Sequence, residues 1–165
     1  MDSSSPSPDR KAMLQPPTLR DFDIVRVIGK GGFSTVFQGN INSIHLYCLV
    51  RKKDEGTIFA MKCLKKEQIK RENKVRHVMN EREILQTVRH PFIVKMHWAF
   101  QSQHYLFIVL EFCPGGEIFY HMNKVLRFSE RVAKFYFAEI VLALEYLHNR
   151  SIFYRDLKPE NILLD

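Results

Sequence analysis

The chain has 165 residues, enough for one ordinary domain, and its 45% apolar and 12% aromatic content is typical of a globular protein rather than a disordered one. A net charge of +7 would suit a nucleic-acid or anionic-membrane partner, but the basic residues are scattered along amphipathic segments apart from one cluster between Lys62 and Arg76, so we interpret them as a solvated surface. The three cysteines form no CxxC pair and the seven histidines show no ligand spacing, so neither a disulfide framework nor a histidine-based metal site is expected.

Residues 1–20 are rich in serine and proline and lack hydrophobic periodicity, so we expect them to form a disordered tail. This tail has no apolar signal-peptide core, and no run in the chain reaches the ~18 apolar residues of a membrane-spanning helix. We therefore expect an intracellular, cytoplasmic protein without a membrane span, with entry into the nucleus left open.

Strand patterns come next along the chain. The run "FDIVRVIG" after Asp21 alternates like a strand, and "GKGG" interrupts it. The runs "FSTVFQ" and "TIFAMKCL" predict two more strands, whereas "GNINSIHLYCLVRKKDEG" between them fits no simple pattern.

Helical patterns dominate the second half. Apolar residues at helical spacing predict a helix in "KVRHVMNEREILQTVRH", ended by His90-Pro91. The runs "IVKMHWAF" and "YLFIVLEF" predict two strands, followed by a turn at "PGG". The segment from Ser129 to Asn149 is the clearest helix, with Ser129 as its N-cap and a broad apolar face. The order predicts an α+β protein.

Three glycines, Gly29, Gly31 and Gly32, follow the first predicted strand. Because they lack a Cβ atom, their backbone N–H groups could approach phosphate oxygens closely, although glycines after a strand often only make a turn. A strand pattern follows them, which argues against the Rossmann arrangement, where a helix follows.

An ammonium group inside the apolar run "IFAMKCL" is costly unless it is paired, and this run contains Lys62. Glu81, in the predicted helix that follows, is either a solvated acid or the partner that holds Lys62 against phosphates.

The run "YRDLKPEN" is the most specific signal. Asp156 can accept a hydroxyl proton, Lys158 can neutralise a transferring phosphoryl group, and Asn161 offers a neutral oxygen to a magnesium ion. These residues, in this order and downstream of the glycines, Lys62 and Glu81, indicate phosphoryl transfer.

With these motifs, the sequence from Phe22 to Asp165 resembles the protein kinase family. "IGKGGFSTV" resembles its glycine-rich loop, "FAMK" its strand lysine motif, "NEREIL" the helix with the paired glutamate, and "YRDLKPEN" its catalytic loop. "LKPEN" is similar to serine/threonine kinases. Tyr154 in place of the usual histidine, with "HPFIV", "GGEIF" and "FYFAEIVLALEYLH", resembles the AGC group, nearest to its ribosomal-protein-S6-kinase-type and protein-kinase-B-type enzymes.

The resemblance implies a protein-kinase-like fold, with a mainly β N-lobe over residues 21–112 and the first part of a helical C-lobe over residues 113–165. It implies an ATP-dependent serine/threonine kinase that uses ATP and Mg²⁺. The implied partners are protein substrates with Ser/Thr acceptors in a basic sequence context and an upstream activating kinase, and no nucleic acid is expected.

The resemblance also implies roles for individual residues. Asp156, Lys158, Lys62 and Glu81 would be catalytic, and Asn161 would bind the metal. Leu110 would lie beside the adenine, Glu111 and Cys113 would offer hinge backbone groups, Glu117 would reach the ribose, and Val36, Ala60 and Leu163 would sandwich the adenine ring. The full implied nucleotide-binding set is Ile28, Gly29, Lys30, Gly31, Gly32, Phe33, Ser34, Val36, Ala60, Lys62, Leu110, Glu111, Cys113, Glu117, Glu160, Asn161 and Leu163.

Three departures from the family pattern stand out. Ser34 replaces the third loop glycine, from which we expect altered loop flexibility rather than loss of ATP binding. The link from this loop to Lys62 is longer by roughly 11 residues. Removing Gly39–Leu49 would restore a family-like hairpin, so this segment is either a tip extension or translated intron sequence, and we favour the second.

The family's DFG aspartate would fall about a dozen residues beyond Asn161, and the chain ends at Asp165.

We therefore expect an incomplete catalytic domain that is inactive as it stands. The alternative hypothesis is a catalytically inactive, kinase-derived module that binds a nucleotide or a partner.

Overall fold

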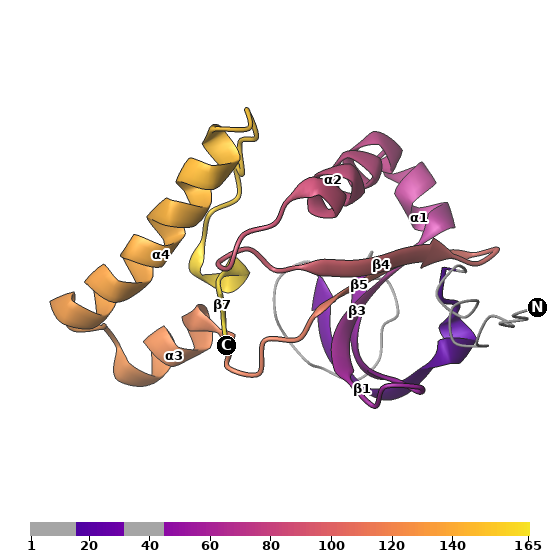
Figure 1. Cartoon of the computed structure of the whole chain (residues 1–165), viewed down its shortest axis with the longest axis horizontal. Helices are drawn as coiled ribbons and strands as arrows, with labels where there is room; N and C mark the ends of the chain where they lie inside the picture. The colour runs from indigo at the N-terminus through magenta and orange to yellow at the C-terminus, as the bar shows by residue number, and fades with distance from the viewer. Residues whose placement is uncertain (1–15, 32–44) are drawn as a thin grey trace, which may run out of the picture. The chain divides into compact units, whose positions relative to one another are not determined.

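A computed structural model describes residues 16–31 and 45–165 (Figure 1). Its elements follow the predicted α+β order, and the predicted fold class is confirmed. In chain order they are η3 (Leu19–Asp21), β1 (Phe22–Gly31), β2 (His45–Lys52), β3 (Ile58–Lys65), α1 (Lys66–Arg71), α2 (Val75–Thr87), β4 (Met96–Gln101), β5 (Tyr105–Glu111), β6 (Gly116–Glu117), α3 (Ile118–Val125), α4 (Glu130–His148), η4 (Pro159–Asn161) and β7 (Leu163–Leu164).

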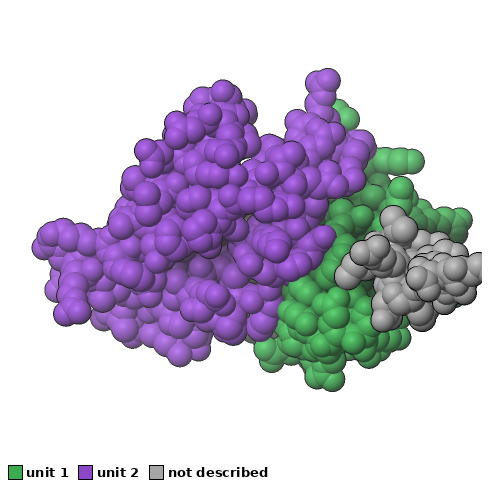
Figure 2. All heavy atoms as spheres, viewed as in Figure 1, with its two compact units in different colours: residues 1–74, 98–109 green, residues 75–97, 110–165 purple. Residues whose placement is uncertain are grey.

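The described chain divides into two compact units, which Figure 2 shows in different colours. Unit 1 comprises residues 1–74 and 98–109, and unit 2 comprises residues 75–97 and 110–165. The lobe boundary after residue 112 and the tail over residues 1–20 stay predictions.

The main sheet has five strands in the order β1-β2-β3-β5-β4. Both the β1–β2 and the β2–β3 pairs are antiparallel, so β2 lies between its two sequence neighbours. The segment that the sequence left unassigned therefore contains a strand in the interior of the sheet.

The segment Gly39–Leu49 has two parts in the structure. Residues 39–44 lie outside the described residues, as does the predicted strand "FSTVFQ". His45–Leu49 form the first five residues of β2, and Cys48 and Leu49 are buried. These five residues belong to the sheet rather than to a loop at the tip of a hairpin.

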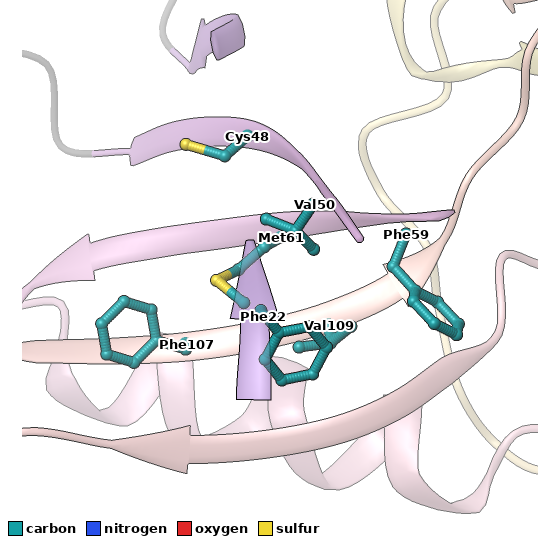
Figure 3. Close-up of a cluster of buried hydrophobic side chains, with 7 residues drawn as sticks. All are labelled: Phe22, Cys48, Val50, Phe59, Met61, Phe107 and Val109. Carbon is teal, nitrogen blue, oxygen red and sulfur yellow. The ribbon is translucent and has the colours of Figure 1, made fainter. Parts of the chain in front are cut away.

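Alternation along the strands forms the core of unit 1, because successive side chains of a strand point to opposite faces. Phe22 from β1, alternate residues of β2 and β3 and two residues of β5 converge in one cluster (Figure 3). The cluster consists of Phe22, Cys48, Val50, Phe59, Met61, Phe107 and Val109. Val50, Met61 and Val109 are fully buried. Burying each such side chain is worth about 1.5–3 kcal/mol.

Two thiols meet beside this core. Cys48 lies in β2 and Cys63 lies in β3, where the Cys63 thiol donates to the Met61 carbonyl at 3.9 Å. Burial raises the pKa of the Cys48 thiol, and it raises the pKa of Cys63 to about 12.

Lys52, at the end of β2, is a buried cation that the structure satisfies. Its ammonium contacts the carboxylates of Asp54 and Glu55 and lies 5.4 Å from the centre of the Trp98 ring. Burial works against the charge, but the hydrogen bonds to Asp54 and Glu55 outweigh it, so the pKa of Lys52 is raised. The turn between β2 and β3 is thereby tied to the sheet.

The short helix α1 was not predicted. Its first amide, from Lys66, donates to the carbonyl of His104 in the turn between β4 and β5, and the Lys66 ammonium donates to Gln101 at 2.7 Å. Contacts from distant residues hold this six-residue helix, so local pattern gave little sign of it.

Within unit 2, the helix predicted over residues 129–149 is confirmed as α4, Glu130–His148, and the predicted cap is confirmed because Ser129 Oγ accepts from the Val132 amide. Phe135, Phe137 and Val141 of α4 are largely exposed. Tyr146 accepts a hydrogen bond from the Arg89 amide at 2.9 Å, which joins α4 to the segment after α2.

Within the described residues, no helix is both long enough and apolar enough to cross a membrane.

Candidate active site

The three polar residues of "YRDLKPEN" come together in one exposed loop of unit 2. Lys158 Nζ lies 3.0 Å from Asp156 Oδ1. Asn161 Nδ2 donates to both Asp156 Oδ2 and the Asp156 carbonyl, each at 2.8 Å. The Asp156 carboxylate thus has a cation on one oxygen and an amide on the other.

These contacts change the acidity of Asp156. The Lys158 ammonium, and after it the Asn161 amide, stabilise the carboxylate and lower the pKa of Asp156 below its usual value. The side chain is 65% exposed, so the carboxylate is accessible to a molecule in solution, and it is ionised at neutral pH.

The residue before Asp156 has a strained backbone conformation. Arg155 has φ of +60°, and the Asp156 amide donates to the Tyr154 carbonyl at 2.9 Å, which closes a three-residue turn. Such turns with a positive φ at a non-glycine residue are rare and cost about 1–3 kcal/mol. Strain of this kind is typical of functional loops.

Asn161 fits the predicted metal role. Both of its hydrogen bonds to Asp156 use the Nδ2 atom, so neither occupies Oδ1, which is the atom that Mg²⁺ would bind. The short helix η4, Pro159–Asn161, sets the direction of this side chain and also contains Glu160, which is half-buried. Among the described residues, no group of three or more His, Cys, Asp or Glu could hold a metal ion.

A small two-stranded sheet brings two predicted nucleotide residues together. Glu117 of β6 pairs with Leu163 of β7, and both side chains are exposed. Gly115 precedes this ladder, and a Cβ atom there would lie 2.6 Å from the Leu164 carbonyl oxygen. The glycine is therefore required for the close approach of the two segments.

Leu110, predicted to lie beside the adenine, and the two predicted hinge residues Glu111 and Cys113 lie at and after the end of β5. Leu110 and Glu111 are the last residues of the strand, and all three are half-buried. The Glu111 carboxylate accepts from the Lys95 amide at 2.7 Å, and the Glu111 amide donates to the Lys95 carbonyl. Burial, then the charges of Glu111 and Asp165, raise the pKa of Cys113.

Unit 1 contains the other predicted nucleotide-binding residues that are described. Ala60 and Lys62 lie in β3, where Ala60 is half-buried and Lys62 is only 7% exposed. Ile28, Gly29, Lys30 and Gly31 lie in β1, and the Ile28 side chain is exposed. Gly32, Phe33, Ser34 and Val36 lie outside the described residues.

Glu81 lies in α2 of unit 2 and is half-buried. Its pairing with Lys62, which belongs to unit 1, stays a prediction.

Tyr47 was not among the residues predicted from the sequence. It lies in β2 directly opposite Lys62, whose ammonium is 5.9 Å from the centre of the Tyr47 ring. The alternation in "HLYCLVRK" was the available signal, but the resemblance marked its first five residues, His45–Leu49, as part of an insertion.

Comparison with known proteins identifies the family of this chain. The family model of the protein kinase domain matches residues 22–165. "Protein kinase 2" of Dictyostelium discoideum is 50% identical over 151 residues, which cover 92% of this chain and 29% of that protein. The "RAC family serine/threonine-protein kinase homolog" of the same organism is 46% identical over 146 residues, covering 88% of this chain and 30% of that protein. "Ribosomal protein S6 kinase beta" of Caenorhabditis elegans is 47% identical over 160 residues, which cover 92% of this chain and 27% of that protein.

The chain therefore belongs to the protein kinase family, and the relatives it matches are serine/threonine kinases of the AGC group. It spans less than a third of the length of these three relatives.

Proposed function

We propose that this chain contains the nucleotide-binding strands and the catalytic loop of an ATP-dependent serine/threonine protein kinase. The observation that carries the proposal is the constellation of Asp156, Lys158 and Asn161. It combines an ionised carboxylate, an ammonium 3.0 Å from it and an amide oxygen suited to Mg²⁺ in one exposed loop.

In this proposal, Asp156 accepts a hydrogen bond from the substrate hydroxyl and orients its oxygen toward the γ-phosphorus. The new bond joins that oxygen to phosphorus while the bond to the β–γ bridging oxygen breaks, the hydroxyl proton passes to the Asp156 carboxylate, and ADP leaves with the electron pair. Lys158 neutralises charge on the transferring group, and Lys62 positions the other phosphates. Magnesium, when bound at Asn161 Oδ1, would supply further charge neutralisation.

Residues 1–165 contain no Asp-Phe-Gly sequence. The carboxylate of that motif supplies a magnesium ligand in kinases. The polypeptide of these 165 residues, made alone, is therefore expected to bind ATP and Mg²⁺ weakly and to transfer no phosphate.

The test of transfer uses the longest natural polypeptide that contains these residues, with peptides that offer serine, threonine or tyrosine in a basic context. Asp156→Asn removes the negative charge but keeps the shape of the side chain, so the turnover number should fall by about 10³-fold or more while nucleotide affinity changes little. Lys134→Met is the matched control, because Lys134 forms an exposed pair with Glu130 on α4. Near-parental turnover of Asp156→Asn, or a preference for tyrosine, would refute the proposal.

A further inference from the structure

The register of β2 against β3 places two residues of β2 beside the predicted nucleotide residues. Tyr47 is directly opposite Lys62, and Leu49 is directly opposite Ala60. Residues paired in this way lie on the same face of an antiparallel sheet, with Cβ atoms about 4.5–5.5 Å apart. Cys48 and Met61, the pair between them, belong to the core cluster of the other face. One face of the sheet therefore carries Tyr47, Leu49, Ala60 and Lys62.

The Tyr47 ring contacts the Lys62 ammonium. The distance of 5.9 Å from Nζ to the ring centre is within the ~6 Å range of a cation–π interaction. Lys62 is 7% exposed, and removal from water strengthens the attraction between a cation and an aromatic face. Tyr47 is itself held in place because its strand is paired on both sides.

We propose that Tyr47 is a positioning residue that holds the Lys62 ammonium for the phosphates of ATP. Tyr47 lies on β2 opposite this lysine. Val36, which the resemblance places against the adenine ring, lies outside the described residues. The inference rests on the proposed function, because it concerns the nucleotide site of the same kinase.

The chemistry favours an aromatic ring for this task. A long lysine side chain loses rotamer freedom when it is fixed, and a neighbour that restricts it beforehand lowers that cost of binding. A neutral ring adds no charge of its own, so it can restrict the ammonium without cancelling the positive charge that attracts phosphate oxygens. The ammonium has three N–H donors, so a contact with the ring on one side leaves donors for a nucleotide.

The test measures binding of ATP with Mg²⁺, and separately of adenosine, to the 165-residue chain by ligand-observed NMR, which suits weak affinities. Tyr47→Leu should weaken ATP binding about two- to fivefold, the range of an ordinary cation–π contact, and leave adenosine binding unchanged because adenosine has no phosphates. Tyr47→Phe keeps the ring face and should retain ATP affinity. In a Lys62→Met background, Tyr47→Leu should have no further effect.

The controls separate positioning from folding and from the proposed function. Each variant is checked by circular dichroism, and Tyr47→Val replaces Tyr47→Leu if the leucine variant does not fold. Equal weakening of ATP and adenosine would make Tyr47 a structural residue and overturn the inference. If ATP binding depends on Lys62 but is unchanged in Tyr47→Leu and Tyr47→Val, the inference about Tyr47 is wrong while the proposed function stands. A parent chain that binds neither ligand would overturn the proposed nucleotide site and the inference with it.

Discussion

Asp156 owes its low pKa first to Lys158 and then to Asn161, and this ordering can be tested residue by residue. Lys158→Met removes the larger contribution, so the pKa of Asp156 should rise toward its usual value. Lys134→Met, which removes an exposed ammonium from α4, should leave it unchanged. The measurement is an NMR titration of ¹³C-labelled aspartate carboxyl groups in the 165-residue chain.

The sign of the accompanying stability effect follows from the direction of the shift. Because the folded-state pKa of Asp156 is lowered, the carboxylate stabilises the fold at pH values above its unfolded pKa of about 3.9. This contribution is lost as the pH falls through the lower, folded-state value. An Asp156 pKa that did not respond to Lys158→Met would show that the 3.0 Å ion pair is absent in solution.

Residues that act within one short segment were predictable from the sequence. Asp156, Lys158 and Asn161 span six positions, so their order alone indicated that their side chains could meet, and the structure brings them together. The pairing of Glu117 with Leu163 joins segments far apart in the chain through a two-residue ladder, which leaves no periodic pattern to detect. Tyr47 was missed for a different reason: two segments of the chain have a pattern suited to β2.

At the scale of a single element, α4 depends on its N-cap. Ser129 Oγ accepts from the Val132 amide at 3.4 Å, one of the amides that a helix leaves without an internal partner. Ser129→Ala should lower the free energy of unfolding by about 1 kcal/mol, and Ser129→Asp should retain it because aspartate caps equally well. Urea denaturation followed by circular dichroism measures both variants. Equal stability of the alanine variant and the parent would mean that the cap contributes nothing.

At the scale of the whole molecule, the five-stranded sheet requires that the position of β2 be filled. His45–Leu49 fill it now, and Cys48 and Leu49 are buried there. Replacing residues 45–49 with glycine and serine should cost about 3 kcal/mol or more, because each large-to-small change at a buried site leaves a cavity. The melting transition of unit 1 should broaden or disappear.

Deleting Gly39–Leu49 is the matched comparison, since it removes more residues than the replacement changes. Joining Gln38 to Val50 would put Val36, Phe37 and Gln38 at the strand positions of Tyr47, Cys48 and Leu49. This variant should keep a cooperative thermal transition, measured by calorimetry. If the deletion unfolds the protein while the glycine and serine replacement does not, our account of what fills β2 is wrong.

The cysteines of this protein can report local opening of the fold. Cys48 and Cys63 lie in unit 1 and Cys113 lies in unit 2, and burial raises the pKa of all three thiols. An alkylating reagent reacts with the thiolate, so modification of the buried Cys48 has to wait for a local opening that returns its sulfur to water, whereas the half-buried Cys63 and Cys113 are slowed by the raised pKa of their thiols. The rate at which mass spectrometry finds Cys48 alkylated, with Cys113 as the partly exposed reference, would therefore time the opening of β2 without a label having to be introduced.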